Sequence, residues 1–566
     1  MSKETGSILG VAAGILESID LSKIRDEGAR QCVVGLLNLH EQVMDALRQS
    51  QEEVQRLRDE IARLKGEQGK PEIKGNTPKP PPSGSSDYSS ERERHTPKPW
   101  SKGTKVDKVH IDREQTLSLD RATLPPDAEF KGHEEVPVQD VVFRTDNVLF
   151  RKEKYYSEAE GKAYLAPLPP GYDGEFGPGI KALTLTLYFG IGTSEPKILE
   201  LFRNQGIRIS DGQLSNLLIK GKGSFHAEKD ALFEAGLRST PWQHLDQTGT
   251  RVNGQNRQCQ IVCNPLYTAY RTTETKGRLS VLDTLRNGRP RTFLLNGEAQ
   301  GFLEQTQLAK ATMAQLKKLP WERVLEEETM TGLLAEHLPN LGPQQQRWIL
   351  DATAVAAYHA QTEFPVVRLL VCDDAPQFTW LTEELALCWV HEGRHYKKLT
   401  PWVPLHRQLL EQFLTEFWDY YRELLGYREG SSPAQAERLS ARFDELFATV
   451  TGYRLLDDRI AKTRDKKGAL LLVLSHPEIP LHNNPAELGA RARVRKRDVS
   501  FGPRTPEGSQ AWDTFMSLAE TAKKLGISFH DYVHDRITHT NWIPRLDAVI
   551  EARSKELNLA PSWNSS

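Results

Sequence analysis

One long stretch near the N-terminus does most to limit how this chain can fold. Residues 67–108 are rich in Pro, Ser, Gly and Lys and lack apolar periodicity, which is typical of a flexible linker. The linker separates residues 1–66 from everything that follows. Because 566 residues exceed what a single hydrophobic core holds, we predict a multidomain protein of mixed α and β structure.

The segment before the linker carries a heptad repeat. Mostly apolar residues, with one His and one Ser among them, recur at alternating spacings of three and four, with charged residues on the other helical faces. The repeat runs through Leu36, His40, Val43, Leu47, Ser50, Val54, Leu57, Ile61 and Leu64. This pattern predicts a helical, coiled-coil dimerisation segment over residues 1–66, and hence a homodimer or a higher homo-oligomer. The alternative is one amphipathic helix that lies on its own domain.

Residues 109–176 are expected to form a small β-rich module. Residues 136–156 alternate between apolar and polar and include β-branched side chains. We predict a hairpin there, turning at Asp146-Asn147.

Residues 177–238 are expected to be helical. Gly206 separates two helices, and Ser210 and Gln213 form a capping box that opens the second. This pattern predicts a helix-turn-helix-like, DNA-binding segment, and an ordinary helical hairpin is the alternative. The side chains predicted to meet DNA are Gln213, Asn216 and Lys220.

From residue 239 the pattern becomes α/β. Three consecutive strands are expected, joined by turns at Asn253-Gly254 and Asn264-Pro265. Residues 366–372 read as a buried strand. We predict a catalytic domain over residues 239–535, with helical insertions near residues 297–361 and 395–478. Its final helix is expected near residues 507–525, and a polar tail over residues 536–566.

Three carboxylates hold related positions in this domain. Asp246 ends a predicted short strand, Asp373 ends the buried strand, and Glu487 begins a predicted helix. Neighbouring strands and a helix packed on them can bring such groups together, where they repel one another unless a cation compensates. The cofactors predicted are two Mg²⁺ ions about 4 Å apart, with Mn²⁺ as a substitute. Asp374 is the alternative to Asp373.

Each carboxylate also has a simpler interpretation. Glu487 can bond back to the cap residue of a helix that begins near Asn484. Asp246 can cap a turn, and Asp373 can precede a helix.

A run of positive charge follows Glu487. We predict that these side chains neutralise a DNA backbone, with a solvated basic helix as the alternative. The residues are Arg491, Arg493, Arg495, Lys496, Arg497 and Arg504. The net charge of the chain is only -2, so DNA binding has to come from local patches of this kind.

Four sequence blocks carry a family resemblance. They read HLDQTGTRVNG, LLVCDDAPQF, LCWVHEGRH and HNNPAELGARARVRKRDVSFGPRTPEG. Together they resemble the DDE transposases of the insertion sequence 66 family. The resemblance implies an RNase H-like catalytic core in which Asp246, Asp373 and Glu487 form the catalytic, metal-binding triad. It also implies metal-dependent cleavage at transposon ends, strand transfer of the 3′-hydroxyl into target DNA, double-stranded DNA as the partner, and room for accessory proteins.

The chain departs from the usual family pattern at several positions. Gln247 follows the first aspartate where the family usually has Glu, Asp374 stands where Gly is common, and Leu488 where Arg is usual. The cysteine pairs of the family's N-terminal zinc module are absent. None of these differences removes a metal-binding carboxylate.

Cys388, His391 and His395 fall at helical spacings that allow one shared face. Three ligands without a fourth do not make a typical zinc site. We therefore expect an auxiliary role near the site, with His391 orienting a phosphate or a catalytic aspartate.

Two related functions stay open from the sequence: a metal-dependent nuclease without strand transfer, and a transposase-derived DNA-binding regulator with a silent site. A structural protein assembled through the coiled coil fits the basic run poorly. Five cysteines and no apolar run of membrane-spanning length predict a cytoplasmic protein. The family resemblance implies, further, a prokaryotic protein associated with the nucleoid.

Overall fold

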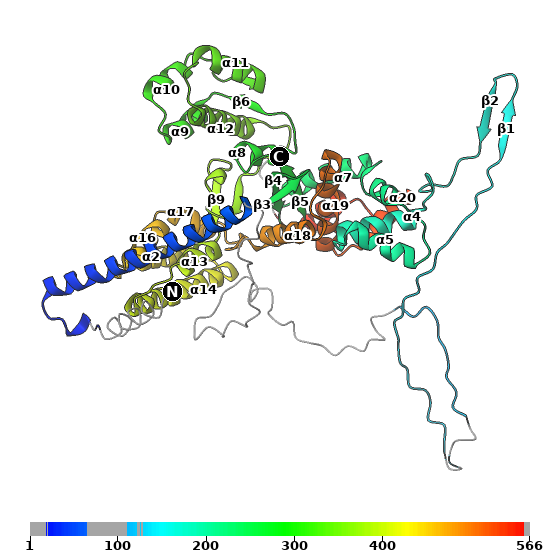
Figure 1. Ribbon diagram of the computed structural model, residues 1–566, viewed down its shortest axis with the longest axis horizontal. Helices are drawn as coiled ribbons and strands as arrows, with labels where there is room; N and C mark the ends of the chain where they lie inside the picture. Colours follow the sequence, from blue (N-terminus) through cyan, green and yellow to red (C-terminus); the bar gives the residue numbers. More distant parts are fainter. Residues whose placement is uncertain (1–18, 20, 65–109, 121–124, 126–127, 560–566) are drawn as a thin grey trace.

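A five-stranded mixed sheet lies at the centre of the computed structural model, with helices around it (Figure 1). Its strand order is β5-β4-β3-β8-β9. The structure describes residue 19, residues 21–64, residues 110–120, residue 125 and residues 128–559. The linker predicted at residues 67–108 lies outside the described residues.

The three consecutive strands predicted after residue 239 are present, and they pair as an antiparallel meander. They are β3 (Trp242–Val252), β4 (Gln255–Cys263) and β5 (Thr268–Thr273). Asn253 and Gly254 have φ angles of 50° and 75°, the positive values that a tight two-residue hairpin turn requires. This turn pairs Val252 with Gln255 and so sets the register of the whole β3–β4 pair.

The other two strands run parallel to β3. They are β8 (Leu369–Cys372), the strand predicted at residues 366–372, and β9 (Glu384–Leu387). Every residue of β8 is buried, because helices cover both faces of this part of the sheet.

A helical lobe lies between β5 and β8, at the top of Figure 1. Its elements are α8 (Arg278–Leu285), β6 (Thr292–Leu294), α9 (Gly297–Glu304), α10 (Lys310–Leu316), β7 (Val324–Glu326), α11 (Glu327–His337) and α12 (Pro343–Ala360). The last helix, α12, is almost entirely buried along its second half and leads the chain back to β8.

A second helical lobe lies between β9 and the helix that carries Glu487. It consists of α13 (Trp389–Lys397), α14 (Pro404–Glu429), α15 (Pro433–Phe447), α16 (Arg454–Arg464) and α17 (Lys467–Leu470). Aromatic side chains dominate its core, including Trp389, Phe417 and Phe443.

Two helices pack against the sheet: α18 (Asn484–Ser500) on β3 and β4, and α19 (Pro506–Leu525) on β5. Side chains of α19 bond directly to the edge of β5: Ser517 Oγ accepts from the N–H of Tyr270 at 2.9 Å, and Thr521 Oγ1 from that of Thr268 at 3.1 Å. These bonds satisfy backbone donors that an open sheet edge would leave to solvent or to another strand.

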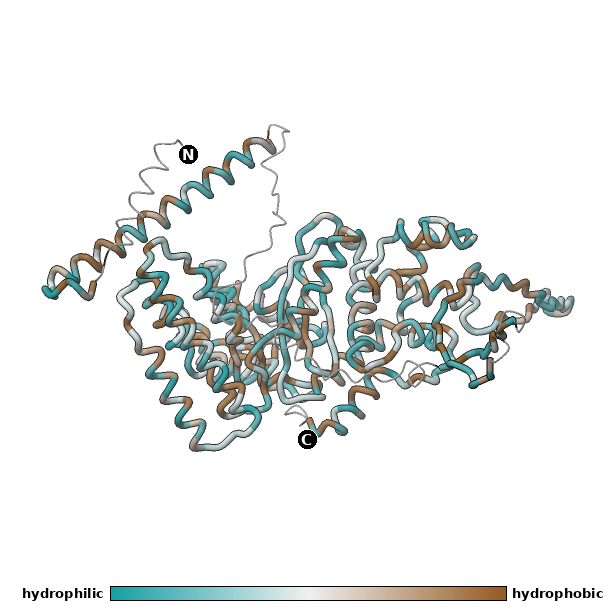
Figure 2. The backbone as a smooth tube through the Cα atoms, turned by 90° about the horizontal axis from the view of Figure 1, so that it is seen from below, coloured by the Kyte–Doolittle hydropathy of each residue, from teal (hydrophilic) through white to brown (hydrophobic). Residues whose placement is uncertain are grey.

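Helix α2 (Glu27–Leu64) both docks on its own chain and exposes an apolar stripe. Glu41 is buried and accepts hydrogen bonds from the N–H groups of Trp402 and Val403, at the start of α14. The exposed apolar side chains are Leu36, Leu39, Val43, Leu47, Val54, Leu57, Ile61 and Leu64. Figure 2 shows the repeated apolar residues along this helix. The coiled coil stays a prediction.

The segment before the sheet is helical, as predicted. Its elements are α4 (Pro178–Leu185), η4 (Thr186–Gly190), α5 (Glu195–Asn204), α6 (Asp211–Ile219) and α7 (Gly223–Arg238). Gly206 has a φ of 74° in the turn between α5 and α6. The capping box of Ser210 and Gln213 opens α6, so that prediction is confirmed.

The predicted hairpin lies elsewhere. Its strands are β1 (Lys154–Ser157) and β2 (Lys162–Leu165), and the chain turns between them rather than at Asp146-Asn147. Gly161, with a φ of 60°, supplies the left-handed backbone that closes this turn. Around Asp146-Asn147 the alternating residues have no paired strand in the described part of the chain.

The predicted polar tail is also wrong in part. The chain continues into α20 (Phe529–Thr538) and α21 (Leu546–Glu556). Leu546 and Ile550 of α21 are fully buried, and α21 packs against α7. Among the described helices, none has the length and apolar character needed to cross a membrane.

Candidate active site

Asp246 and Asp373 lie at matching positions along neighbouring parallel strands, Asp246 within β3 and Asp373 directly after the end of β8. The last paired residues of β3 and β8 are His244 and Val371, and each aspartate follows its pair by two residues. Matching positions on parallel strands point to the same face of a sheet, so the two side chains approach each other. Asp246 lies within β3 rather than at a strand end as predicted, because β3 continues to Val252 along β4.

Glu487 reaches the same region from the first turn of α18. The side chain of Asn483 donates to the carbonyl of Leu245 at 2.7 Å and bonds to His244 Nδ1 at 3.0 Å, which anchors the helix start beside Asp246. Gly489 allows close packing, since a Cβ there would lie 2.8 Å from Ile261 Cγ2. The N-terminal turns of α18 therefore lie directly on the sheet.

The helix-cap interpretation of Glu487 is not what the structure shows. The cap residue of α18 is Asn483, and no side chain makes a capping bond there. The Glu487 carboxylate instead accepts two hydrogen bonds from Arg394 of α13, at 3.1 Å to Oε1 and 3.0 Å to Oε2.

The protonation of Asp246 depends on its burial and on the other two acids. Burial raises the pKa of Asp246 to about 7, and the negative charges of Asp373 and Glu487 act in the same direction. Burial also works to raise the pKa of Glu487, but the hydrogen bonds and charge of Arg394 outweigh it and leave that pKa below its usual value. Glu487 is therefore ionised at neutral pH, while Asp246 is poised to gain or lose a proton.

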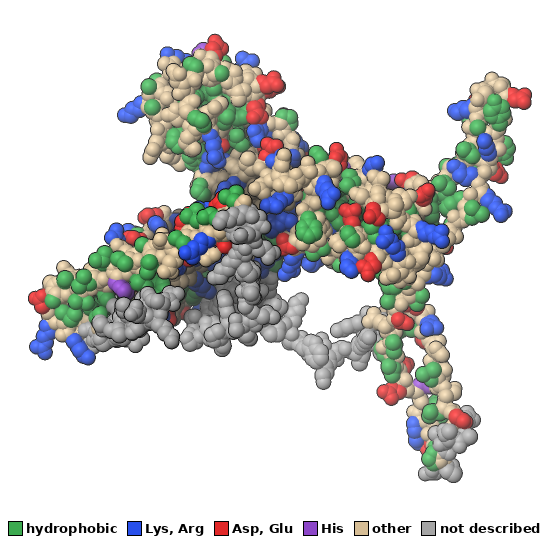
Figure 3. Space-filling view, in the orientation of Figure 1, with side chains coloured by type: hydrophobic (Ala, Val, Ile, Leu, Met, Phe, Trp, Pro, Cys, Tyr) green, Lys and Arg blue, Asp and Glu red, His purple; other side chains and the backbone are tan. Residues whose placement is uncertain are grey.

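A cavity of about 440 Å³ opens at this place. It is lined by Asp246, Gln247, Thr248, His391, Arg394, Glu487, Ala490, Arg491, Val494 and Arg495. Figure 3 shows Lys and Arg side chains gathered near the centre of that view, where Figure 1 places α18. The cavity combines a carboxylate floor with an arginine rim, which suits a phosphodiester and a cation together.

The exposed members of the predicted basic run are Arg491, Arg495 and Arg504. Arg491 and Arg495 follow each other by one helical turn and lie on the cavity rim. Arg497 is half-buried, donates to the carbonyl of Gly249 and lies 3.6 Å from Asp498.

Arg493 and Lys496 do not face solvent, which corrects their assignment to a DNA surface. The guanidinium of Arg493 is 0% exposed and pairs with Asp513 at 3.1 Å and Thr272 at 2.8 Å. Lys496 donates to the carbonyl of Thr193 at 3.1 Å and lies against the Tyr188 ring. Both are turned inward because α18 packs between the sheet and its neighbouring helices, so only part of its circumference meets solvent.

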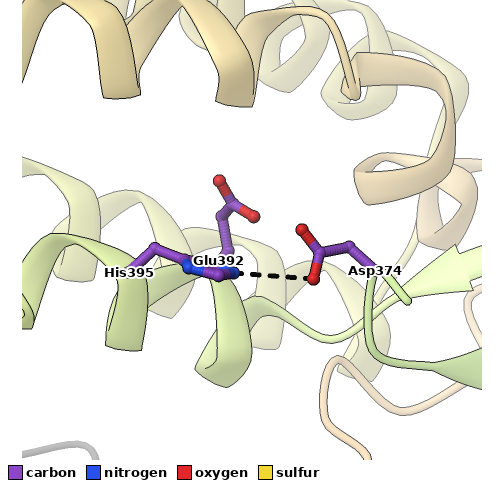
Figure 4. Close-up of side chains that lie close together, drawn as sticks. All are labelled: Asp374, Glu392 and His395. Carbon is purple, nitrogen blue, oxygen red and sulfur yellow. Dashed lines mark ion pairs between the residues drawn. The ribbon is translucent and has the colours of Figure 1, made fainter. Parts of the chain in front are cut away.

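Figure 4 shows a second cluster of ionisable side chains. Ligand atoms of Asp374, Glu392 and His395 all lie within 4.8 Å of one another, and no other such group of three occurs among the described residues. The chain already supplies cations here: Lys466 pairs with Asp374 and, at 3.1 Å, with Glu392, which also pairs with Arg459. Asp374, the alternative to Asp373, thus belongs to a separate ion-pair network.

The oxygens of Asp246, Asp373 and Glu487 are more spread, since they do not form such a group. All three offer carboxylate oxygen, the ligand that Mg²⁺ and Mn²⁺ prefer. Asp246 carries a pKa shift that neighbouring positive charge would reverse. The donor set therefore fits divalent cations, although Glu487 is turned toward Arg394.

Cys388, His391 and His395 do not point to one position. Cys388 is buried, and its sulfur accepts from the N–H of Asn483 at 3.2 Å. His391 Nε2 accepts from Arg394 at 3.0 Å, whereas His395 faces Asp374 at 3.5 Å. A shared zinc site is therefore excluded for these three as they lie here, and His391 is the one beside the candidate triad.

Sequence reasoning missed Arg394 and Lys466, the two cations that hold the acidic clusters. Arg394 lies three residues after His391, one helical turn away, so it was within a block already recognised. No local pattern indicated that its partner would be a carboxylate of α18.

The residues predicted to contact DNA, which lie on α6 and at its C-cap Lys220, are of two kinds. Asn216 and Lys220 are exposed. Gln213 is occupied, since its side chain accepts from the N–H of Ser210 and donates to Glu175 at 2.6 Å. A cavity of about 620 Å³ lies at the turn between α5 and α6, with Arg203 and Arg208 in its lining.

The mixed sheet, the acidic cavity and its arginine rim are features of an enzyme that processes nucleic acid. Comparison with known proteins leads to the same class. Residues 356–511, which contain Asp373 and Glu487, match the transposase IS66 family. The chain is 32% identical over 306 residues to the uncharacterized protein y4jO of Sinorhizobium fredii (strain NBRC 101917 / NGR234), an alignment that covers 54% of this chain and 94% of that protein. No solved structure matches the chain.

The chain therefore belongs to the IS66 family of transposases, and the resemblance seen in the sequence is confirmed. Membership supports a transposase-type function and implies DNA as the molecule that the protein binds.

Proposed function

We propose that this protein is a DDE-type polynucleotidyl transferase, which cleaves DNA at transposon ends and transfers the 3′-hydroxyl to target DNA. The observation that carries the proposal is that Asp373 and Glu487 both act electrostatically on Asp246, and that Asp246 and Glu487 line an arginine-rimmed cavity. Three separate elements, far apart in sequence, supply these acids.

The sheet supports an RNase H-like core for this activity. Its antiparallel part, β5-β4-β3, continues into the parallel strands β8 and β9. Asp246 lies on the central strand β3, Asp373 directly follows the neighbouring strand β8, and α18 packs against β3. Helical insertions on either side of β8 and β9 leave this centre intact.

Asp246, Asp373 and Glu487 are the residues that would hold divalent cations, Mg²⁺ or Mn²⁺. When bound, two such ions supply a lowered pKa for an attacking water or hydroxyl and stabilise charge on the phosphate. Asp246, with a pKa of about 7, releases its proton readily as positive charge approaches. Arg491 and Arg495 neutralise the DNA backbone at the rim, which positions the scissile phosphate.

The outer elements fit the handling of two DNA ends. Asn216 on α6 and Lys220 at the C-cap of this helix are exposed and are proposed to contact DNA, together with Arg504. The apolar stripe of α2 is proposed to join two protomers.

A strand-transfer assay with Mg²⁺ tests the proposal. Wild type is compared with Asp246→Asn, Asp373→Asn and Glu487→Gln on duplexes that carry the transposon ends. We expect each substitution to lower cleavage and joining by more than about 100-fold, because each removes a metal ligand. Asp374→Asn is the matched control, since its carboxylate is held by Lys466, and it is expected to retain most activity.

The other outcomes assign other functions. Cleavage without joining would make the protein a nuclease. Activity or binding that none of the three substitutions changes would make it a silent-site regulator.

A further inference from the structure

Arg394 occupies a position between two good metal ligands. Its Nη1 lies 3.1 Å from Glu487 Oε1 and 3.0 Å from His391 Nε2, and these two acceptors are 3.7 Å apart. Its Nη2 takes the remaining oxygen, Glu487 Oε2, at 3.0 Å. One guanidinium therefore uses both oxygens of Glu487 and the ring nitrogen at once.

The tautomer of His391 follows from this contact. Because Arg394 can only donate, His391 Nε2 has to accept, which places the proton of the neutral ring on Nδ1. Burial lowers the pKa of His391, in keeping with a neutral ring. His391 Nδ1 is buried and has no hydrogen-bond partner in the described structure, so the ring orientation is set mainly by Arg394.

The spacing of the two acceptors is that of ligands on one ion. Two atoms that each lie about 2.1 Å from a divalent metal are separated by roughly 3 to 4 Å, depending on the coordination angle. Glu487 Oε1 and His391 Nε2 satisfy this spacing before any rearrangement. Asp246 adds negative charge from β3, since it interacts electrostatically with both Glu487 and Arg394.

We infer that Arg394 is a resident cation that a divalent metal ion displaces, and that His391 becomes a further ligand of that ion beside Glu487. The inference rests on the proposed function, because it concerns the metal site of that reaction. In the absence of metal, the guanidinium of Arg394 occupies the position that the divalent ion would take.

The exchange has a clear physical basis. Arg394 satisfies a carboxylate that burial would otherwise leave unpaired, at substantial cost in free energy. A doubly charged ion attracts Glu487 and Asp246 more strongly than a delocalised single charge does. Both oxygens of Glu487 are engaged, so the guanidinium has to move away before the ion can bind.

The displaced guanidinium has a place to go. The Arg394 side chain is 38% exposed, and it lines the same cavity as Arg491 and Arg495. A phosphodiester there can accept the paired N–H groups that the carboxylate releases. DNA and metal are then expected to favour each other's binding, by the same factor in either direction.

Mn²⁺ binding to the full-length, DNA-free protein, measured by calorimetry, tests the exchange. Arg394→Gln removes the competing cation and is expected to bind Mn²⁺ at least about 10-fold more tightly than wild type. Arg394→Lys keeps the charge but loses the two-pronged contact, and is expected to fall between. Adding His391→Ala to Arg394→Gln should reverse most of the increase in Mn²⁺ affinity.

Arg491→Gln is the matched control. Its guanidinium lies 3.8 Å from Glu487 Oε2, but it is largely exposed and makes no hydrogen bond to that carboxylate. Screening by water makes its charge weak, so the variant should change Mn²⁺ affinity by less than about 3-fold. This control separates displacement from a general loss of positive charge.

A second readout does not depend on comparing affinities. Without metal, Arg394→Gln leaves Glu487 unpaired, so its Tm should lie below that of wild type. Mn²⁺ should then raise the Tm of Arg394→Gln more than that of wild type. Arg394→Lys supplies the same comparison in a protein that keeps a cation, should the first variant fold poorly.

Different failures have different meanings. If Arg394→Gln and Arg394→Lys bind Mn²⁺ no more tightly than wild type, the exchange is overturned. If His391→Ala leaves the gain intact, His391 is not a ligand. If Asp246→Asn and Glu487→Gln leave Mn²⁺ affinity unchanged, the metal site of the proposed function is itself wrong.

Discussion

At the scale of single residues, the candidate site works through opposed charges held out of water. Asp246 is pushed toward its protonated form by burial and by two neighbouring acids, while Glu487 is kept ionised by Arg394. Two carboxylates of similar chemistry thus differ in protonation because only one has a bound guanidinium. The raised pKa of Asp246 makes the stability of the fold depend on pH.

The pKa of Asp246 predicts how stability changes with pH in the absence of metal. The folded state holds a proton on Asp246 up to about pH 7, whereas an unfolded aspartate loses it near pH 4. Stability therefore falls as pH rises through this window, by on the order of a few kcal/mol. Asp246→Asn should be free of this loss, so its Tm should exceed that of wild type at pH 8 more than at pH 4.5. A constant Tm difference across this range would contradict the assignment.

Two arginines separated by two positions predict opposite phenotypes. Arg493→Ala breaks the ion pair between fully buried Arg493 and half-buried Asp513 and should cost about 3–5 kcal/mol in the free energy of unfolding, measured with urea. Arg495→Ala removes an exposed rim charge and should leave stability within about 0.5 kcal/mol of wild type. It should weaken DNA binding and lower the salt dependence of binding by about one ion, measured by fluorescence anisotropy at several salt concentrations. Equal effects of both variants on stability would contradict the burial of Arg493.

At the scale of elements, the position of α18 decides whether a site exists. Its first turn is tied to β3 by Asn483 and to the start of α13 by the bond to Cys388. Its second turn presses on β4 at Gly489. Glu487 lies between these two attachments, so its distance from Asp246 is set by backbone packing rather than by its own side chain.

Gly489→Ala should therefore disturb both the fold and the site. A Cβ at 2.8 Å from Ile261 forces α18 away from the sheet, at a cost of about 1–3 kcal/mol. Gly426→Ala in α14 is the matched control, because a Cβ there meets no atom within 4 Å. That variant should be stabilised by about 0.5–1 kcal/mol, since alanine favours a helix over glycine. Chemical denaturation measures both, and a neutral Gly489→Ala would show that the helix adjusts freely.

At the scale of the whole molecule, a central sheet is flanked by two large helical lobes (Figure 1). The N-terminal helix α2 lies against one of these lobes. The lobe between β9 and α18 supplies Arg394 and Lys466, the cations that pair with Glu487 and Asp374. Helix α2 packs through Glu41 against the lobe between β9 and α18, and its apolar stripe is exposed to solvent.

The stripe of α2 predicts a dimer that depends on this helix. Val43→Lys together with Leu47→Lys places charge in an apolar seam and should convert a dimer to a monomer, measured by light scattering after size exclusion. Glu52→Lys changes charge on an exposed position outside the stripe and should leave the dimer intact. Monomeric wild type at every concentration would remove the coiled coil from the proposal.

Local rules determined a good part of this protein from its sequence alone. The Asn253-Gly254 turn, the capping box of α6 and the apolar strand β8 depend on residues close together in the chain, where steric and hydrogen-bonding preferences act directly. The family blocks likewise pointed to the three acids before any fold was known.

Only the tertiary structure decided which charges meet. Arg394 and Glu487 are 93 positions apart, and Arg493 is buried because α18 lies between a sheet and a helix that no local pattern places. Asp246 sits inside β3 because β4 extends the strand, and the predicted tail is helical because α7 offers a surface for α21. Such outcomes depend on which faces of distant elements pack together. Local sequence patterns reflect only residues close together in the chain, so they do not predict that packing.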